Sequence, residues 1–187
     1  EIQVYITGGV VSKDKTYALD GKDFLIASKD YPTSEADILT MIRTQGGLKL
    51  TQILPVPATD LDVTNISINK DALPGPRVPG VVTPDGTYDV HLSYGTGDSE
   101  VKMTIKVTIT QSATKLNVRF VDENDQDIVQ KLEIDVQSGQ TYDLTADDDV
   151  KQKIEDAKGE YYDLDQRPAN EANYLINQDP TEAKYTF

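Results

Sequence analysis

The sequence predicts an α+β protein in which two domains follow one another along 187 residues. Each half contains segments in which apolar and polar residues alternate, the period of a β-strand that is buried on one face. Each half also contains one amphipathic stretch with helix-capping residues at its start and glycine at its end. In the short polar segment of residues 111–114, apolar residues recur with neither the strand period nor the helix period. This segment is therefore expected to separate the domains.

The first half is predicted to begin with a short strand within residues 1–9, ended by a glycine pair. A helix is expected over residues 34–45, because Ser34 and Asp37 resemble a capping box and a second glycine pair follows Gln45. One apolar face of this helix is expected to reach the core. Its members are Ile38, Leu39, Met41 and Ile42.

The middle of the first half is rich in proline, with six of the nine prolines between Pro55 and Pro84. Proline fixes φ and has no amide hydrogen, so this segment is predicted to be a stiff, irregular connection rather than a helix or a central strand. Residues 63–68 within it are expected to form one brief strand. A hairpin of two alternating strands, residues 88–94 and 101–109, is predicted to close the half.

The second half repeats this order. Alternating apolar residues predict a hairpin with a turn at residues 122–127, and Thr145 with Asp148 resembles a second capping box. The helix is expected to end at Gly159, and three short strands are expected to return within residues 161–164, 174–176 and 185–187. A hairpin, a helix and returning strands around a mixed sheet are typical of the β-grasp (ubiquitin-like) fold. We therefore expect two tandem β-grasp domains, residues 1–110 and 114–187, arranged end to end.

The formal charge of −14 is unevenly distributed. Residues 1–112 hold 14 acidic and 10 basic residues (−4), and residues 113–187 hold 18 and 8 (−10). Nucleic acids and anionic membrane surfaces attract basic proteins, so both are disfavoured as partners. No apolar run approaches the ~20 residues that cross a bilayer, so no membrane insertion is expected. The abrupt start and end predict a piece of a longer protein.

The sequence contains no cysteine, which excludes disulfides, thiol catalysis and cysteine-ligated zinc. Asp89, His91 and Ser93 supply the residue types of a hydrolase triad on one predicted strand. Residues two apart on a strand lie ~6.5–7 Å apart, whereas a nucleophile and its base need ~3 Å. Other acidic residues occur in turns and at helix starts, and there is no tryptophan to hold a sugar in a cleft. We therefore expect no enzymatic activity.

The acidic turn Asp122, Asp125 and Asp127 is a candidate calcium site, because Ca²⁺ prefers several oxygen ligands from a flexible loop. The turn is not an EF-hand, since the required glycine and final glutamate are missing. The alternative is that these residues form only a hairpin turn, where Asp and Asn tolerate unusual dihedral angles. No cofactor is expected to be required, and structural calcium is left open. Two further acidic pairs are Asp20 with Asp23, and Asp60 with Asp62.

Tyr161, Tyr162 and Tyr174 are candidate ligand-binding residues, because tyrosine can stack on sugars or anchor a protein partner. The alternative is that tyrosines pack in the core. For the adjacent pair Tyr161 and Tyr162, one buried and one exposed ring is expected.

The segment Val118-Arg-Phe-Val-Asp-Glu-Asn-Asp-Gln-Asp-Ile128, followed by Ser138-Gly-Gln-Thr-Tyr142, resembles the mucin-binding repeats of Gram-positive surface adhesins. It is most similar to the two-part repeats of lactobacillus mucus-binding proteins. The likeness covers residues 116–187, and residues 1–110 take the place of the companion domain. The family turn often carries glycine where this chain has Asn124 or Asp125.

This resemblance implies the β-grasp fold and a role as a bacterial cell-surface adhesion module. Such a module would be extracellular, attached to the cell wall through the full-length protein, and adjacent to further repeats of the same chain. The implied partners are host mucin glycoproteins, with immunoglobulins as a further class. A structural spacer that projects a distant adhesive domain from the cell wall is the alternative.

Overall fold

The computed structural model describes residues 9–160 and 162–187, and the predicted α+β class is confirmed. The strand expected near the N-terminus lies in residues 1–8, outside the described part. The chain divides into two compact units. The first unit holds the residues up to Ile26, together with Asp30–Arg77 and Asp85–Thr110; the second holds Ala27–Lys29, Val78–Pro84 and Gln111–Phe187.

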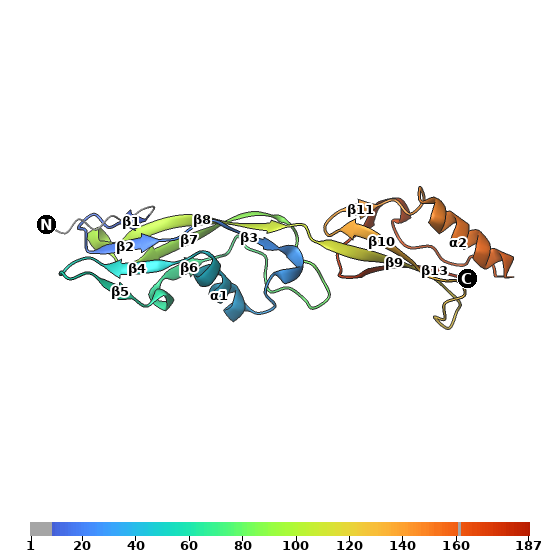
Figure 1. The fold of residues 1–187 in the computed structure, drawn as a ribbon, viewed down its shortest axis with the longest axis horizontal. Helices are drawn as coiled ribbons and strands as arrows, with labels where there is room; N and C mark the ends of the chain where they lie inside the picture. Colours follow the sequence, from blue (N-terminus) through green and yellow to red (C-terminus); the bar gives the residue numbers. More distant parts are fainter. Residues whose placement is uncertain (1–8, 161) are drawn as a thin grey trace. The chain divides into compact units, whose positions relative to one another are not determined.

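The first unit contains two four-stranded sheets (Figure 1). The first sheet has the order β1 (Val10–Val11), β2 (Tyr17–Asp20), β4 (Lys49–Gln52) and β5 (Thr59–Leu61), with antiparallel neighbours throughout. The second has the order β3 (Phe24–Ala27), β8 (Val101–Thr110), β7 (Gly86–Tyr94) and β6 (Ser67–Asn69). Short 3₁₀ turns connect to these strands along the chain: η1 (Ser28–Asp30), of which Ser28 and Lys29 belong to the second unit, η2 (Val63–Asn65) and η3 (Gly97–Ser99).

Helix α1 (Glu35–Gln45) begins as predicted, because Ser34 caps it. The Ser34 Oγ accepts a hydrogen bond from the Asp37 amide (3.1 Å) and donates one to the Asp37 carboxylate (2.6 Å). Gly46 ends the helix: its amide donates to the Ile42 carbonyl, and a Cβ there would lie 2.4 Å from that oxygen. Three of the four residues predicted on the apolar face of this helix are buried, and they share one core with both sheets. These residues are Ile38, Met41 and Ile42.

The predicted hairpin of β7 and β8 is confirmed, with Val90 and Ile105 buried and His91 and Thr104 exposed. The strand predicted over residues 63–68 is wrong in position. Asp62 accepts a hydrogen bond from the Thr64 amide (2.8 Å) and so begins a 3₁₀ turn, and the strand starts only at Ser67. The proline-rich connection is irregular around its prolines, as predicted, but it also contains the short edge strands β5 and β6.

The second unit is built on a three-stranded mixed sheet with the order β10 (Leu132–Gln137), β9 (Ala113–Val121) and β13 (Thr181–Thr186). Strand β9 pairs with β10 antiparallel and with β13 parallel. Helix α2 (Asp148–Gly159) shares a core with this sheet, and a second small sheet pairs β11 (Thr141–Tyr142) with β12 (Tyr174–Leu175). The short turn η4 (Glu171–Asn173) precedes β12. Phe120 and Tyr185 stack in the core with ring centroids 5.4 Å apart.

Two expectations for the second unit are wrong. The capping residue of α2 is Asp147 and not Thr145, because Asp147 Oδ1 accepts hydrogen bonds from the amides of Asp149 (2.9 Å) and Val150 (3.0 Å). The described residues 162–164 form no strand: the pairing with β13 begins only afterwards, where the amide of Gln166 donates to Thr186.

Three buried serines hold together distant segments of the second unit. Ser28 Oγ lies 3.0 Å from Ser112 Oγ and 2.7 Å from Ser138 Oγ. The amide of Ser112 donates to Ser138 Oγ (2.7 Å), and the amide of Ser138 donates to the Ser112 carbonyl (2.8 Å). Residues 78–84 extend this contact, since the Thr83 amide donates to the Ser28 carbonyl (3.3 Å). The polar segment at residues 111–114 is therefore partly buried, and residues from the first half of the sequence complete the second unit.

We predict that Ser28→Ala destabilises the protein by about 1–3 kcal/mol, because it removes a hydrogen-bond partner from two buried hydroxyl groups. Urea denaturation of the whole chain measures the change. Ser67→Ala, at an exposed position on β6, is the matched control and is expected to change stability by less than about 0.5 kcal/mol. Equal effects of the two substitutions would contradict the structural role of the serine cluster.

Candidate functional site

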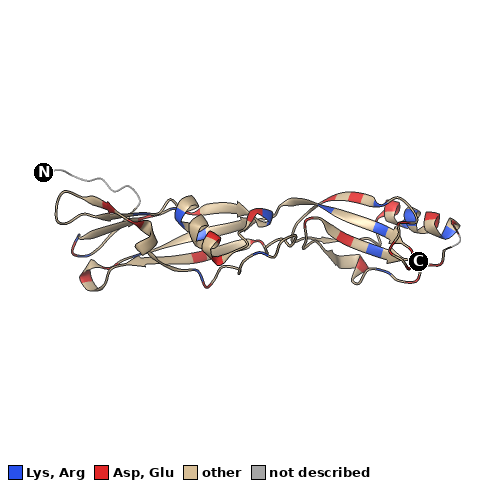
Figure 2. Ribbon diagram, turned by 90° about the horizontal axis from the view of Figure 1, so that it is seen from below, with Lys and Arg blue, Asp and Glu red and all other residues tan. Residues whose placement is uncertain are grey.

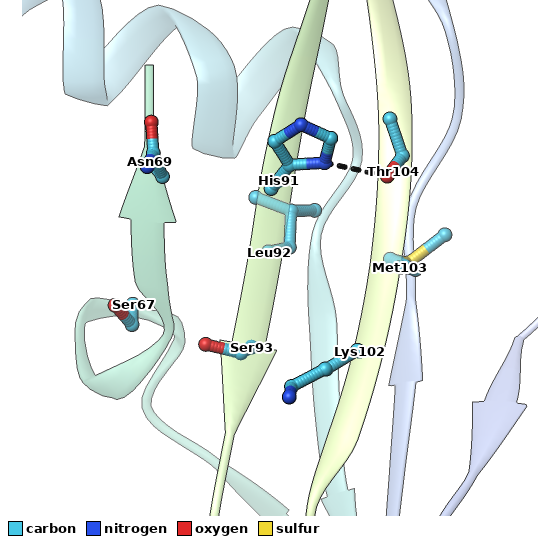
Figure 3. A pocket seen from close by; sticks show the side chains of 8 residues that line it. All are labelled: Ser67, Asn69, His91, Leu92, Ser93, Lys102, Met103 and Thr104. Atoms are coloured by element: carbon cyan, nitrogen blue, oxygen red, sulfur yellow. Dashed lines mark hydrogen bonds between the residues drawn. The ribbon is translucent and has the colours of Figure 1, made fainter. Parts of the chain in front are cut away.

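Six polar side chains form two cross-strand rows on the outer face of β6, β7 and β8 in the first unit (Figure 3). Successive side chains of a strand point to opposite faces, so residues two apart on each strand share this face. We call the six residues the polar ladder. Its rows are Asn69, His91 and Thr104, and Ser67, Ser93 and Lys102.

The polar ladder surrounds a shallow depression of about 360 Å³, whose lining also includes Leu92 and Met103 from the same two strands. His91 Nδ1 lies 2.8 Å from Thr104 Oγ1, and Lys102 forms an ion pair with Glu100 at 3.0 Å. The ladder therefore offers hydroxyl, amide, imidazole and ammonium groups on one accessible face. Such a set of donors and acceptors can bind a polar ligand through several hydrogen bonds at once.

The three residue types of a hydrolase triad do not meet on β7. Asp89 forms an ion pair with Lys106 (2.8 Å), which lowers the pKa of Asp89 and raises that of Lys106. The His91 ring instead contacts Thr104 on the neighbouring strand. His91 is exposed on the outer face of β7, and its place in the ladder suits binding.

The candidate tyrosines have different surroundings. Tyr161 lies outside the described residues. Tyr162 is 38% exposed and is available to a partner. Tyr174 packs against the core of the second unit, its hydroxyl donates to the Glu182 carbonyl (2.5 Å), and burial raises its pKa. The ring of Tyr174 therefore stabilises the fold, while ligand binding by Tyr162 stays a prediction.

The aspartates of the acidic turn have separate partners within the second unit. Asp122 Oδ1 accepts hydrogen bonds from two backbone amides of the turn, both at 2.9 Å. Asp125 pairs with Lys184 (2.7 Å), and Asp127 pairs with Arg119 (2.8 Å). Within residues 9–160 and 162–187, no group of three or more His, Asp or Glu side chains is placed to hold a metal ion. Calcium binding here stays a prediction, and it would require these ion pairs to open.

The other acidic pairs also have protein partners. Asp62 caps η2, and Asp60 forms an ion pair with Lys49 at 3.5 Å. The Asp23 carboxylate accepts a hydrogen bond from the Lys106 amide (2.8 Å).

Charged residues of both signs lie along β10, β9 and β13 (Figure 2). The register places Lys115 beside Asp135 and Arg119 beside Lys184, opposite to the buried face of β9. Arg119 approaches Asp125 and Glu182 in addition to Asp127, and Lys115 pairs with Asp135. The basic residues thus neutralise part of the acidic charge of this unit. This network of ion pairs was not predicted, although the alternation of polar with apolar residues along residues 115–120 was a signal for a charged outer face.

The polar ladder was also not predicted as a group. The outward position of His91 followed from strand alternation, but Ser67 and Asn69 join it only through the register of β6 against β7. That register depends on pairing between distant segments, for which the local sequence carries no pattern.

The described residues contain no helix that is long and apolar enough to cross a membrane. Neither a scan against protein-family models nor a search of curated proteins finds a match to this chain. A function for the chain must therefore be argued from the polar ladder and the exposed side chains.

We predict that Lys184→Met raises the pKa of Asp125, because the Lys184 ammonium is the main cause of its lowered value. A lowered pKa stabilises the folded state above the pKa of the unfolded chain, and this stabilisation is lost as the pH falls. The variant should therefore lose less stability on acidification than the wild type. Carboxyl NMR titration of Asp125 measures the shift directly.

Lys158→Met is the control, since Lys158 pairs with Glu155 elsewhere in the second unit. An Asp125 titration midpoint that is the same in both variants and the wild type would contradict the assigned ion pair.

Proposed function

We propose that this chain is a non-enzymatic adhesion module that binds glycoproteins of host mucus, with immunoglobulins as a further class of partner. The observation that carries the proposal is the polar ladder, an accessible surface of hydrogen-bonding groups around a shallow depression. Sugar hydroxyls are both donors and acceptors, and the ladder supplies matching groups in two rows. The chemistry of this surface fits recognition rather than bond cleavage.

The fold of the second unit supports the resemblance to mucin-binding repeats. Its hairpin of β9 and β10 is followed by helix α2 and by β13, which returns parallel to β9. This order is the one expected of a β-grasp domain, and we propose that arrangement for the unit. In the first unit, α1 shares a core with a four-stranded sheet and a second sheet is added. We propose that it is an enlarged variant of the same arrangement.

From the resemblance we also propose that the module lies on a bacterial cell surface, attached through the full-length protein. Its net charge of −14 favours solubility and discourages non-specific association with anionic surfaces. One shallow polar surface makes a weak contact, so tandem copies would gain strength through effective concentration.

We predict that the chain binds immobilised intact mucin saturably, and that tandem copies bind more tightly. His91→Ala and Asn69→Ala are each expected to weaken binding about 2–10-fold, the equivalent of one hydrogen bond. Surface plasmon resonance measures both effects. Secretory immunoglobulin on a parallel surface tests the second class of partner.

Thr87→Ala is the control variant, because Thr87 is exposed on β7 beyond the polar ladder. If neither single nor tandem copies bind either surface, the adhesion proposal fails and the role of a structural spacer is favoured instead.

A further inference from the structure

A depression beside helix α2 in the second unit is lined by several basic side chains. Its volume is about 310 Å³, near the lower end of the ~300–1,000 Å³ that small-molecule sites usually span. The charged residues of its lining are three cations, Lys151, Lys158 and Arg167, and two carboxylates, Glu155 and Glu171. This excess of one positive charge contrasts with the charge of −10 that residues 113–187 carry as a whole. We call the depression the basic pocket.

The spacing of residues on α2 supplies one side of the basic pocket. Lys151, Glu155 and Lys158 are four and three positions apart, so they share one face of the helix. Ile154 lies on the same face and is buried in the core of the second unit. The core therefore holds the backbone that carries these three charged side chains.

Arg167 is held by a carboxylate that the core fixes in turn. Its Nη1 donates hydrogen bonds to both oxygens of Glu171 (2.8 and 3.2 Å). The hydroxyl of Tyr185, a fully buried residue, donates to Glu171 Oε1 (2.6 Å). The Glu171 side chain is 14% exposed, whereas the Arg167 side chain is 52% exposed. The guanidinium is thus oriented from the core and remains accessible to a ligand.

The cations of the basic pocket keep hydrogen-bond donors that the protein does not use. Nε and Nη2 of Arg167 take no part in a hydrogen bond among residues 9–160 and 162–187. These two groups can donate in parallel to two oxygens of one oxyanion. Lys151 and Lys158 each have three donors, of which the described protein atoms use two and one. All three cations can therefore contact a ligand while keeping their protein partners.

The basic pocket also offers hydrogen-bond acceptors. Glu155 Oε1 accepts from Lys158 Nζ (2.8 Å), and its Oε2 accepts no hydrogen bond within the described part of the chain. The Thr145 hydroxyl donates to Asp143 Oδ1 (2.5 Å), so its own lone pairs stay available to a donor. A bare anion would leave these acceptors unused. A sugar with an anionic substituent places hydroxyl donors next to its negative charge and can use both sets of groups.

We propose that the basic pocket binds a sugar through a singly charged oxyanion, either a sulfate ester or a carboxylate. One negative charge matches the excess of one positive charge in the lining. Arg167 binds two oxygens of the anionic group, Lys158 contributes charge, and Glu155 accepts hydrogen bonds from sugar hydroxyl groups. The basic pocket lies in the second unit and the polar ladder in the first, so this site goes beyond the proposed function and its test does not depend on mucin binding.

The test uses the whole chain and three sugars that differ only at the last carbon: galactose 6-sulfate, galacturonic acid and galactose. NMR titration of the backbone amides and the Arg167 Nε–H group measures the affinities. The wild type should bind one or both anionic sugars at least tenfold more tightly than galactose, and salt should weaken this binding. Arg167→Lys keeps the charge but loses the paired donors, and Lys158→Gln loses the charge. Each should weaken the binding of the anionic sugar about 3–10-fold.

Lys131→Gln is the matched control, because Lys131 pairs with Glu133 (2.8 Å) in the second unit but outside the basic pocket. Lys131→Gln and His91→Ala should both bind the anionic sugars as the wild type does. Urea midpoints equal to the wild type show that the variants fold, and the exposed position of Lys158 on α2 makes Lys158→Gln the safer of the two pocket variants.

Three results would each overturn the inference: no binding of either anionic sugar, equal binding of galactose, or an equal loss of affinity in a pocket variant and a control variant. None of them bears on the adhesion proposal, which is measured on immobilised mucin with variants of the polar ladder.

Discussion

The hydrogen bonds among Ser28, Ser112 and Ser138 are the constraint on which the second unit depends. Each serine comes from a different part of the sequence, and all three are buried. A buried hydroxyl without a partner is costly, so the cluster is stable only when the three segments are together. Residues 27–29 and 78–84 are therefore part of the second unit. The hydrogen bond between Ser28 and Ser138 joins residues that are 110 positions apart in the sequence.

The part of the fold that the sequence predicts is the part set by local patterns. Helix α1 follows from a capping serine and a glycine stop, and the β7–β8 hairpin follows from alternation. The cap of α2 was predicted at Thr145 but lies at Asp147, because both residue types can cap a helix and only the backbone geometry chooses between them. The serine cluster could not be predicted, since hydrogen bonds between distant segments leave no periodic signal.

In the candidate site, too, local patterns predict some residues, whereas contacts between distant segments decide the others. Strand alternation places His91 on the outer face, whereas the residues opposite it depend on non-local register. For Tyr174, the residue type suits ligand binding, but the structure packs the partly buried ring against the core of the second unit. Residues 53–58 are six apolar residues in a row, but the sequence alone does not show whether they are buried or exposed. A buried run of this kind would be core, and here Val56 is exposed.

The parallel pairing of β9 with β13 has a mechanical consequence. The two strands are matched over six residues, from Thr181 beside Leu116 to Thr186 beside Val121. A force that pulls the start of β9 away from the end of β13 acts along both strands in opposite directions. Their hydrogen bonds are then loaded together and must shear at once, whereas a hairpin pulled from its open end breaks one bond after another. This geometry resists extension along the strands.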